Sequence, residues 1–182
     1  MKKYFLFLIL MVASGCATAQ SYTKNGIDFK QFKKVAVVKL DCSNSAVGQE
    51  VADIVAFAFI KKGYNVIERS QLRSITDENA LISSGLTETN KSALKLAGIN
   101  AIIVGSVSRY DCQPDKVFAM IGLAPIVLNT NNCHASLSLK MLDVNSGDIL
   151  WMANGANSKN DSNMTAHKVL QTVLELIEEK IP

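Results

Sequence analysis

The stretch from residue 33 to residue 68 constrains the fold most, because the spacing of its apolar residues changes twice. Residues 33–40 (KKVAVVKL) are β-branched and almost continuously apolar, which is typical of a strand buried on both faces. Residues 48–62 place apolar side chains three and four positions apart, as one buried face of a helix requires, and Gly63 suits the end of that helix. Residues 64–68 fit a second, short strand. This order predicts a right-handed βαβ unit with parallel strands.

Two helices and a third strand are expected to follow the βαβ unit. Residues 69–80 fit one helix. A shorter helix, capped by Thr87 or Thr89, is expected to run to Leu96. Residues 100–110 (NAIIVGSVSRY) are again rich in β-branched apolar residues and fit the third core strand.

The last third of the chain predicts an antiparallel hairpin and a helix. Residues 133–144 alternate between apolar and polar, so one face of this strand is buried and the other is wet. Residues 145–147 supply a glycine-containing hairpin loop, and residues 148–155 return antiparallel. Residues 164–181 fit an amphipathic helix. The expected fold class is α/β: a mixed sheet of about five strands, with a βαβ core and the C-terminal hairpin at its edge, packed with about four helices.

The first 16 residues follow the three-part plan of a secretory signal. Lys2 and Lys3 precede an apolar stretch from residue 4 to residue 12, and small residues at 13–15 precede Cys16. The apolar stretch is about half of the roughly 20 residues that a membrane-spanning helix needs. The sequence ASGC that ends at Cys16 resembles the lipobox of bacterial lipoproteins. The resemblance implies that Cys16 carries a diacylglycerol and becomes the first residue of the mature protein.

The chain is expected to have three parts: a signal peptide (residues 1–15), a lipidated cysteine with a polar tether (residues 16–32) and one α/β domain (residues 33–182). The polar segment after Cys16 is interpreted as a tether followed by an entry strand. In lipoproteins of this kind an aspartate after the cysteine retains the protein at the inner membrane, and this chain has Ala17 there. The resemblance therefore implies a lipid anchor at the periplasmic face of the outer membrane. The alternative is an ordinary signal peptide cut near Ala19, which would discard the cysteine.

The charge balance argues against a nucleic-acid partner. The 182 residues hold 19 Lys and Arg against 16 Asp and Glu, a net charge of +3, and two of the basic residues lie in the signal. A nearly neutral chain without a basic block has no strong attraction for polyanions.

Three further cysteines follow Cys16, and export places them in an oxidising compartment where thiols tend to pair. Cys112 and Cys133 bracket one long connection, so they are the expected partners if a disulfide forms. Spacing alone does not establish the pairing. Cys42 is then left over and is interpreted as a small buried residue.

The sequence contains no catalytic or metal-binding constellation above background. His134 falls on the polar face of a strand and His167 on the polar face of a helix, so both are interpreted as surface residues. Asp77 and Glu78 are interpreted as helix-surface charges. A zinc site built from the cysteines is disfavoured, because structural zinc ligands occur in pairs two to four residues apart. The single glycine of VGSV (residues 104–107) cannot form a phosphate-binding loop. We expect a non-enzymatic protein with no metal and no cofactor.

Residues 35–155 resemble the family of the curli secretion lipoprotein, CsgG. Three segments carry the resemblance: a helix running into GYNVIERSQL (residues 63–72), the strand in LAGINAIIVGSV (residues 96–107) and the hairpin of SGDIL (residues 146–150). A pattern of moderate similarities over most of the chain is better evidence for fold than for function. In the channel members of this family the domains assemble as a ring, and each subunit contributes two amphipathic hairpins to a shared outer-membrane barrel.

The chain departs from that channel pattern at both places where a hairpin would leave the domain. A barrel strand needs about 9 to 11 residues of alternating character. Residues 117–128 are instead apolar throughout and contain Gly122 and Pro125, and a proline cannot donate a hydrogen bond to a ladder. The second place, residues 155–163, is too short to cross a membrane twice. A pore of the full family type is therefore disfavoured.

The apolar residues between Cys112 and Cys133 form a candidate interaction site. One interpretation is a flap that covers a face of the core. The other, which we favour, is a surface that contacts a membrane or a partner, because exposed apolar patches usually mark interaction sites. The candidate residues are Val117, Phe118, Met120, Ile121, Leu123, Ile126, Val127 and Leu128.

These observations predict a lipoprotein that is anchored to the outer membrane and serves as a non-enzymatic subunit or accessory of a curli-type assembly or secretion complex. Its expected partners are the outer membrane, through the lipid, and proteins or further copies in a ring. Two alternatives stay open. Residues 141–155 also resemble the hairpin of the LpoB family, lipoproteins that activate a peptidoglycan synthase (a penicillin-binding protein), although the polar segment after Cys16 is short for that role. A small-ligand-binding periplasmic domain would require a deep polar pocket.

Overall fold

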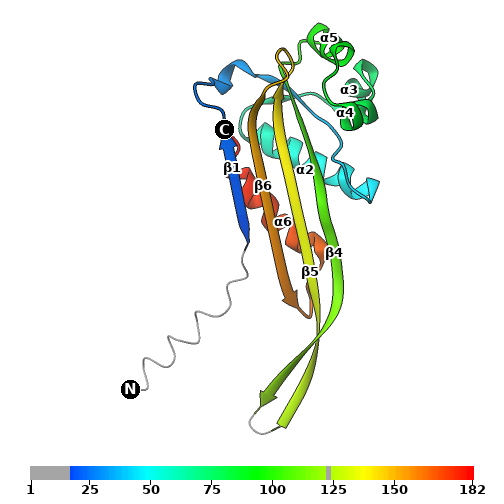
Figure 1. Ribbon diagram of the computed structural model, residues 1–182, viewed down its shortest axis with the longest axis vertical. Helices are drawn as coiled ribbons and strands as arrows, with labels where there is room; N and C mark the ends of the chain where they lie inside the picture. Colours follow the sequence, from blue (N-terminus) through cyan, green and yellow to red (C-terminus); the bar gives the residue numbers. More distant parts are fainter. Residues whose placement is uncertain (1–16, 122–123) are drawn as a thin grey trace.

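The computed structural model describes residues 17–121 and 124–182, and Figure 1 shows their arrangement. Cys16 and Leu123 lie outside the described residues. The fold belongs to the expected α/β class, but its mixed sheet has six strands in the order β1-β6-β5-β4-β2-β3. The strands are β1 (Thr18–Thr23), β2 (Lys34–Val37), β3 (Asn65–Val66), β4 (Ala101–Ile121), β5 (Ala124–Asp143) and β6 (Ile149–Asp161). The helices are the 3-10 turn η1 (Phe29–Gln31), α2 (Ser45–Lys61), α3 (Arg69–Ile75), α4 (Glu78–Ser84), α5 (Glu88–Leu96) and α6 (Ala166–Glu178).

The predicted βαβ unit is formed by β2, α2 and β3. β2 pairs in parallel with β3 on one side and with β4 on the other. α2 begins after Asn44, whose side chain accepts hydrogen bonds from the backbone N–H groups of Ala46 and Val47. These bonds satisfy donors that have no partner within the helix. The helix ends before Gly63, whose φ of +92° is a conformation that favours glycine.

The single helix expected over residues 69–80 is two helices, α3 and α4. Thr76 between them is extended, with φ −154° and ψ 157°, so α3 ends there. Asp77 then accepts a hydrogen bond from the backbone N–H of Asn79 and caps α4. The next helix, α5, is capped by Thr87, one of the two expected caps.

The antiparallel half of the sheet is longer than expected. β4 and β5 pair from Ala101 with Asp143 to Ile121 with Ala124, so the connection expected after residue 110 continues as strand. β6 likewise extends to Asp161. β1 pairs with β6 and takes the sheet edge that the sequence assigned to the C-terminal hairpin. Because β1 begins at Thr18, the folded domain includes residues that were expected to form the tether.

The core consists of two clusters on opposite faces of the sheet. α2 and α6 pack on one face, where Met141 and Trp151 are fully buried. α3, α4 and α5 cover the second, smaller cluster around Ile102. Gly155 lets α6 approach the first face closely, because a Cβ at this position would lie 2.7 Å from Cγ1 of Val173. The helices leave the far end of the β4–β5 hairpin uncovered (Figure 1).

Candidate functional site

β4 and β5 continue past the rest of the sheet as a two-stranded hairpin (Figure 1). The pairing of β6 with β5 ends where Asp161 meets Asn131, so within the described part of the chain the residues nearer the turn have only each other as strand neighbours. We call residues 113–121 and 124–132 the arm, and residues 117–121 and 124–128 its apolar end. The arm occupies the place where the sequence predicted a long connection.

The two prolines of the arm fit a hairpin, because each lies where the β4–β5 ladder needs no donor. The backbone N–H of Val144 donates to the carbonyl of Asn100 at 3.0 Å, and hydrogen-bonded and non-hydrogen-bonded pairs alternate along antiparallel strands. The β4 register shifts between Val107 and Arg109, so the alternation is counted along β5 from Val144. Pro125 and Asn131, the partner of Pro114, then fall in non-hydrogen-bonded pairs, with the proline nitrogens toward the open edges of the arm. Proline is tolerated at such edges. Pro125 therefore does not prevent a strand here, contrary to the expectation from the sequence.

The apolar end is exposed instead of folding back over the core. Phe118 is 76% exposed, Met120 63% and Val127 52%. Side chains alternate between the two faces of a hairpin, so these three residues share one face and Val117 and Leu128 share the other. Both faces of the hairpin are thus apolar, and the interpretation of these residues as a flap over the core is wrong.

The remaining predicted site residues fall into two groups. Ile126 is half-buried and lies on the same face as Val117 and Leu128. The side chain of Ile121, residue Leu123 and the predicted lipid attachment residue Cys16 lie outside the part of the chain that is described. Their roles in the site stay predictions.

The base of the arm is polar and is tied to β6. The side-chain amide of Asn160 donates to the Asp115 carboxylate at 3.0 Å, and Thr130 Oγ1 donates to the backbone carbonyl of Asp115 at 3.4 Å. Lys116 and Asn129 form the last polar pair before the apolar end. The arm therefore changes from polar to apolar within one step of the ladder.

Cys112 and Cys133 lie directly opposite each other where the arm begins. Their Sγ atoms are 2.01 Å apart in a disulfide, and Cys133 is fully buried. The structure thus brings together the two cysteines that the sequence favoured as partners. Cys42 is a free thiol and is half-buried rather than buried.

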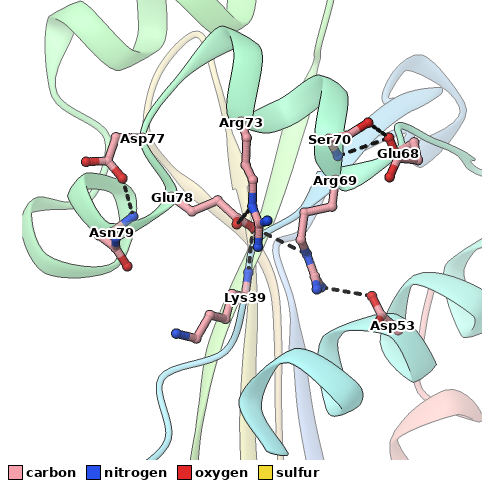
Figure 2. A network of polar contacts seen from close by, with 9 residues as sticks. All are labelled: Lys39, Asp53, Glu68, Arg69, Ser70, Arg73, Asp77, Glu78 and Asn79. Carbon is pink, nitrogen blue, oxygen red and sulfur yellow. Dashed lines mark hydrogen bonds and ion pairs between the residues drawn. The ribbon is translucent and has the colours of Figure 1, made fainter. Parts of the chain in front are cut away.

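An ion-pair network centred on the buried Glu78, at the opposite end of the molecule from the arm, was missed in the sequence (Figure 2). Glu78 is 6% exposed, and its carboxylate lies 2.9 Å from Nε of Arg73 and 3.5 Å from Nε of Arg69. It also accepts a hydrogen bond from the backbone N–H of Lys39 at 3.1 Å. Arg69 reaches Asp53 of α2 at 3.0 Å. The network joins α3 and α4 to the βαβ unit, so the interpretation of Glu78 as a surface charge is wrong.

Within residues 17–121 and 124–182, no three His, Cys, Asp or Glu side chains are placed to hold a metal ion. His134 is half-buried on a sheet face, and Nδ1 of His167 lies 3.6 Å from the Glu50 carboxylate at the surface. None of the described helices has the length and apolarity to cross a bilayer.

Two hollows bear on small-ligand binding. One of about 670 Å³ has Phe32 and Tyr64 in its mainly apolar wall. Burial raises the pKa of Tyr64 to about 12, and its hydroxyl donates to the carbonyl of Pro182 at 3.1 Å. The other, of about 420 Å³, is polar, but Arg73 and Glu78 in its wall already bind each other. Neither is the deep polar pocket that the small-ligand alternative requires.

The fold and the arm define a mixed α/β protein with a projecting, apolar-ended hairpin. The family model of the curli production assembly/transport component CsgG matches residues 16–179, and the chain belongs to this family. No curated protein sequence matches it.

Solved structures agree on the fold. The PelC dodecamer from Paraburkholderia phytofirmans is similar at 14% identity over 89% of this chain and 94% of that one, with a TM-score of 0.58. The lipoprotein GNA1162 from Neisseria meningitidis is similar at 12% identity over 81% and 96%, with a TM-score of 0.53. The LpoB C-terminal domain from Salmonella enterica gives 14% identity over 69% and 82%, but its TM-score of 0.39 is too low to support an argument. At these identities the likeness concerns the fold alone.

Proposed function

We propose that this protein is a lipid-anchored periplasmic lipoprotein of the outer membrane and a non-enzymatic subunit or accessory of an assembly or export complex. One observation carries the proposal: a scaffold of the CsgG family extends an arm whose apolar end has no partner within the described chain. An exposed apolar patch this far from a core usually marks a site where another molecule binds.

The proposed lipid anchor is Cys16, and a single residue, Ala17, separates it from the start of β1. Acyl chains contribute about 0.8 kcal/mol per buried CH₂, so several chains on one cysteine hold a protein on a bilayer without a spanning helix. The anchor would place the domain in the periplasm, where the Cys112–Cys133 disulfide persists.

Self-assembly is the favoured form of partnership. The similar PelC structure is described as a dodecamer. A complete barrel of the family's channel type is not proposed, because β6 ends at Asp161 and α6 begins at Ala166. The residues between them are too few for the second hairpin that each channel subunit contributes.

Activation of a peptidoglycan synthase is the weaker alternative. That role needs a long free segment after the acylated cysteine, to reach across the periplasm. Here Thr18 already pairs with Ala156 in the sheet. The reach of the anchored domain is therefore shorter than the sequence suggested.

Palmitate labelling combined with native mass measurement tests the proposal. Cells expressing the wild type or Cys16→Ala are grown with radioactive palmitate, and the membranes are extracted in mild detergent. We expect label and outer-membrane fractionation only with Cys16, together with an oligomer or a larger complex. An unlabelled wild type, or a labelled protein that stays monomeric and crosslinks to nothing in cells, would refute the proposal.

A further inference from the structure

We propose that the apolar end of the arm embeds in the same membrane leaflet as the Cys16 lipid, as an isolated hairpin at headgroup depth, with the arm lying along the bilayer rather than crossing it. The inference rests on the proposed function, because it takes the lipid anchor as given. Three independent features of the structure support this inference: two concern the arm, and the third concerns the anchor.

The first feature is that both faces of the hairpin are apolar. A barrel strand presents one face to lipid and the other to a polar lumen. Here Phe118 and Met120 cover one face, while Val117 and Leu128 cover the other, and all four are exposed. No charged residue occurs between Lys116 and His134. A hairpin with two apolar faces suits immersion in lipid and does not suit the wall of a water-filled channel.

The second feature is that the apolar end is too short to cross. It has five residues in each strand, which is about 17 Å at roughly 3.3 Å per residue, against a hydrocarbon core of about 30 Å. Its outer edges are also unpaired within the described chain, and open edges are not stable inside hydrocarbon. Pro125 removes one edge donor of the apolar end, and the remaining edge groups can bind water and headgroups near the surface.

The third feature is the short reach of the anchor. Thr18 pairs with Ala156, which pairs with Ser136 of β5, so these residues lie at one level across the sheet. Leu128, the start of the apolar end, lies eight residues farther along β5, or about 27 Å. Cys16 is two residues from Thr18 and reaches at most about 7 Å from it.

An upright molecule therefore cannot place both the anchor and the apolar end at one flat surface while β1 stays in the sheet. Both reach that surface only when the line from Thr18 to the apolar end runs nearly parallel to the bilayer. The strands of the arm then lie close to the membrane plane.

Lipid quenching of tryptophan fluorescence tests the depth. The chain has one tryptophan, Trp151, which is fully buried and serves as an internal reference. The full-length lipidated Phe118→Trp variant is reconstituted in vesicles of phosphatidylethanolamine and phosphatidylglycerol that carry bromine at defined acyl positions. The matched control is Leu96→Trp, because Leu96 is 91% exposed on α5 at the opposite end.

We expect Phe118→Trp to be quenched severalfold more than Leu96→Trp, most strongly by bromine near the headgroups, without release of an entrapped dye. Polarised infrared spectra of oriented bilayers should place the strands near the membrane plane. Quenching no greater than that of Leu96→Trp, strongest quenching at the bilayer centre, dye release or strands along the membrane normal would each overturn the inference. A mass spectrum without acyl chains on Cys16 would instead refute the proposed function, so the two failures are distinguishable.

Discussion

Cys112 and Cys133 join β4 to β5 two residues before β6 stops supporting the hairpin, with their Sγ atoms 2.01 Å apart. From Thr130 toward the turn, neither strand has a strand neighbour among the described residues other than the opposite strand of the hairpin. A two-stranded ribbon in water is marginally stable by itself. The disulfide therefore sits where a covalent link adds most to the order of the arm.

Replacing both cysteines by serine is expected to loosen the arm and to lower the free energy of unfolding by about 2–4 kcal/mol. Amide hydrogen exchange should accelerate in residues 113–121 and 124–132, while the core strands beside α2 and α6 change less. The control is Cys42→Ser, which removes a free, half-buried thiol. Equal exchange rates in the arm of the double variant and the wild type would contradict this prediction.

Glu78→Gln is expected to lower the free energy of unfolding by about 3 kcal/mol, because it leaves Arg69 with a positive charge and little solvent around it. The Arg69 side chain is 12% exposed, and its remaining carboxylate partner, Asp53, is largely exposed. Urea unfolding at neutral pH measures the loss. Glu88→Gln is the matched control, because Glu88 is 87% exposed and pairs with Lys91 at the surface, so this substitution should leave the free energy of unfolding nearly unchanged. A Glu78→Gln loss as small as the control would show that the network is not needed for stability.

The βαβ unit and the C-terminal pairing were predictable because their burial imposes a period on the sequence. Val51 and Val55 repeat with the helical period, and Leu137, Leu139 and Met141 alternate with the strand period. Each pattern fixes one buried face, and the structure buries those side chains.

The arm, and the place of β1 in the sheet, were not predictable by the same means. The apolar end buries neither face, so residues 117–128 have no alternation to read. β1 is exposed along most of its length, and its sequence, TAQSYT, carries no apolar period. Its place in the sheet depends on pairing with β6, which is distant in the chain. The sequence signal for the Glu78 network was the four-residue spacing of Arg69 and Arg73, which brings both guanidinium groups to one helix face.

Tyr64 should make stability fall at high pH. Burial raises its pKa to about 12 from an ordinary value of 10.0, so above about pH 10 the unfolded chain loses a proton that the folded chain keeps. The contribution of Tyr64 is therefore complete below about pH 10 and is lost as the pH rises toward about 12, by at most about 3 kcal/mol. Unfolding in urea at several pH values measures this slope in the wild type and in Tyr64→Phe. We expect a shallower decline in Tyr64→Phe, and identical slopes would contradict the assignment to Tyr64.

A charged residue at the apolar end of the arm should weaken association without changing the stability of the fold. Phe118 is 76% exposed, so Phe118→Asp is expected to change the free energy of unfolding by no more than about 0.5 kcal/mol. Burial of a phenylalanine at an interface or in lipid contributes about 1.5–3 kcal/mol, so the same change should weaken association tenfold or more. Chemical crosslinking in cells and native mass measurement of the extracted protein follow the complex.

Leu96→Asp is the control for the charge at the apolar end, since Leu96 is 91% exposed at the opposite end of the molecule. It should leave both stability and association unchanged. If Phe118→Asp instead unfolds the domain, the side chain supports the fold in a way that its exposure does not indicate. If Leu96→Asp disrupts the complex as strongly as Phe118→Asp does, association depends on the general surface of the protein and the arm has no special role.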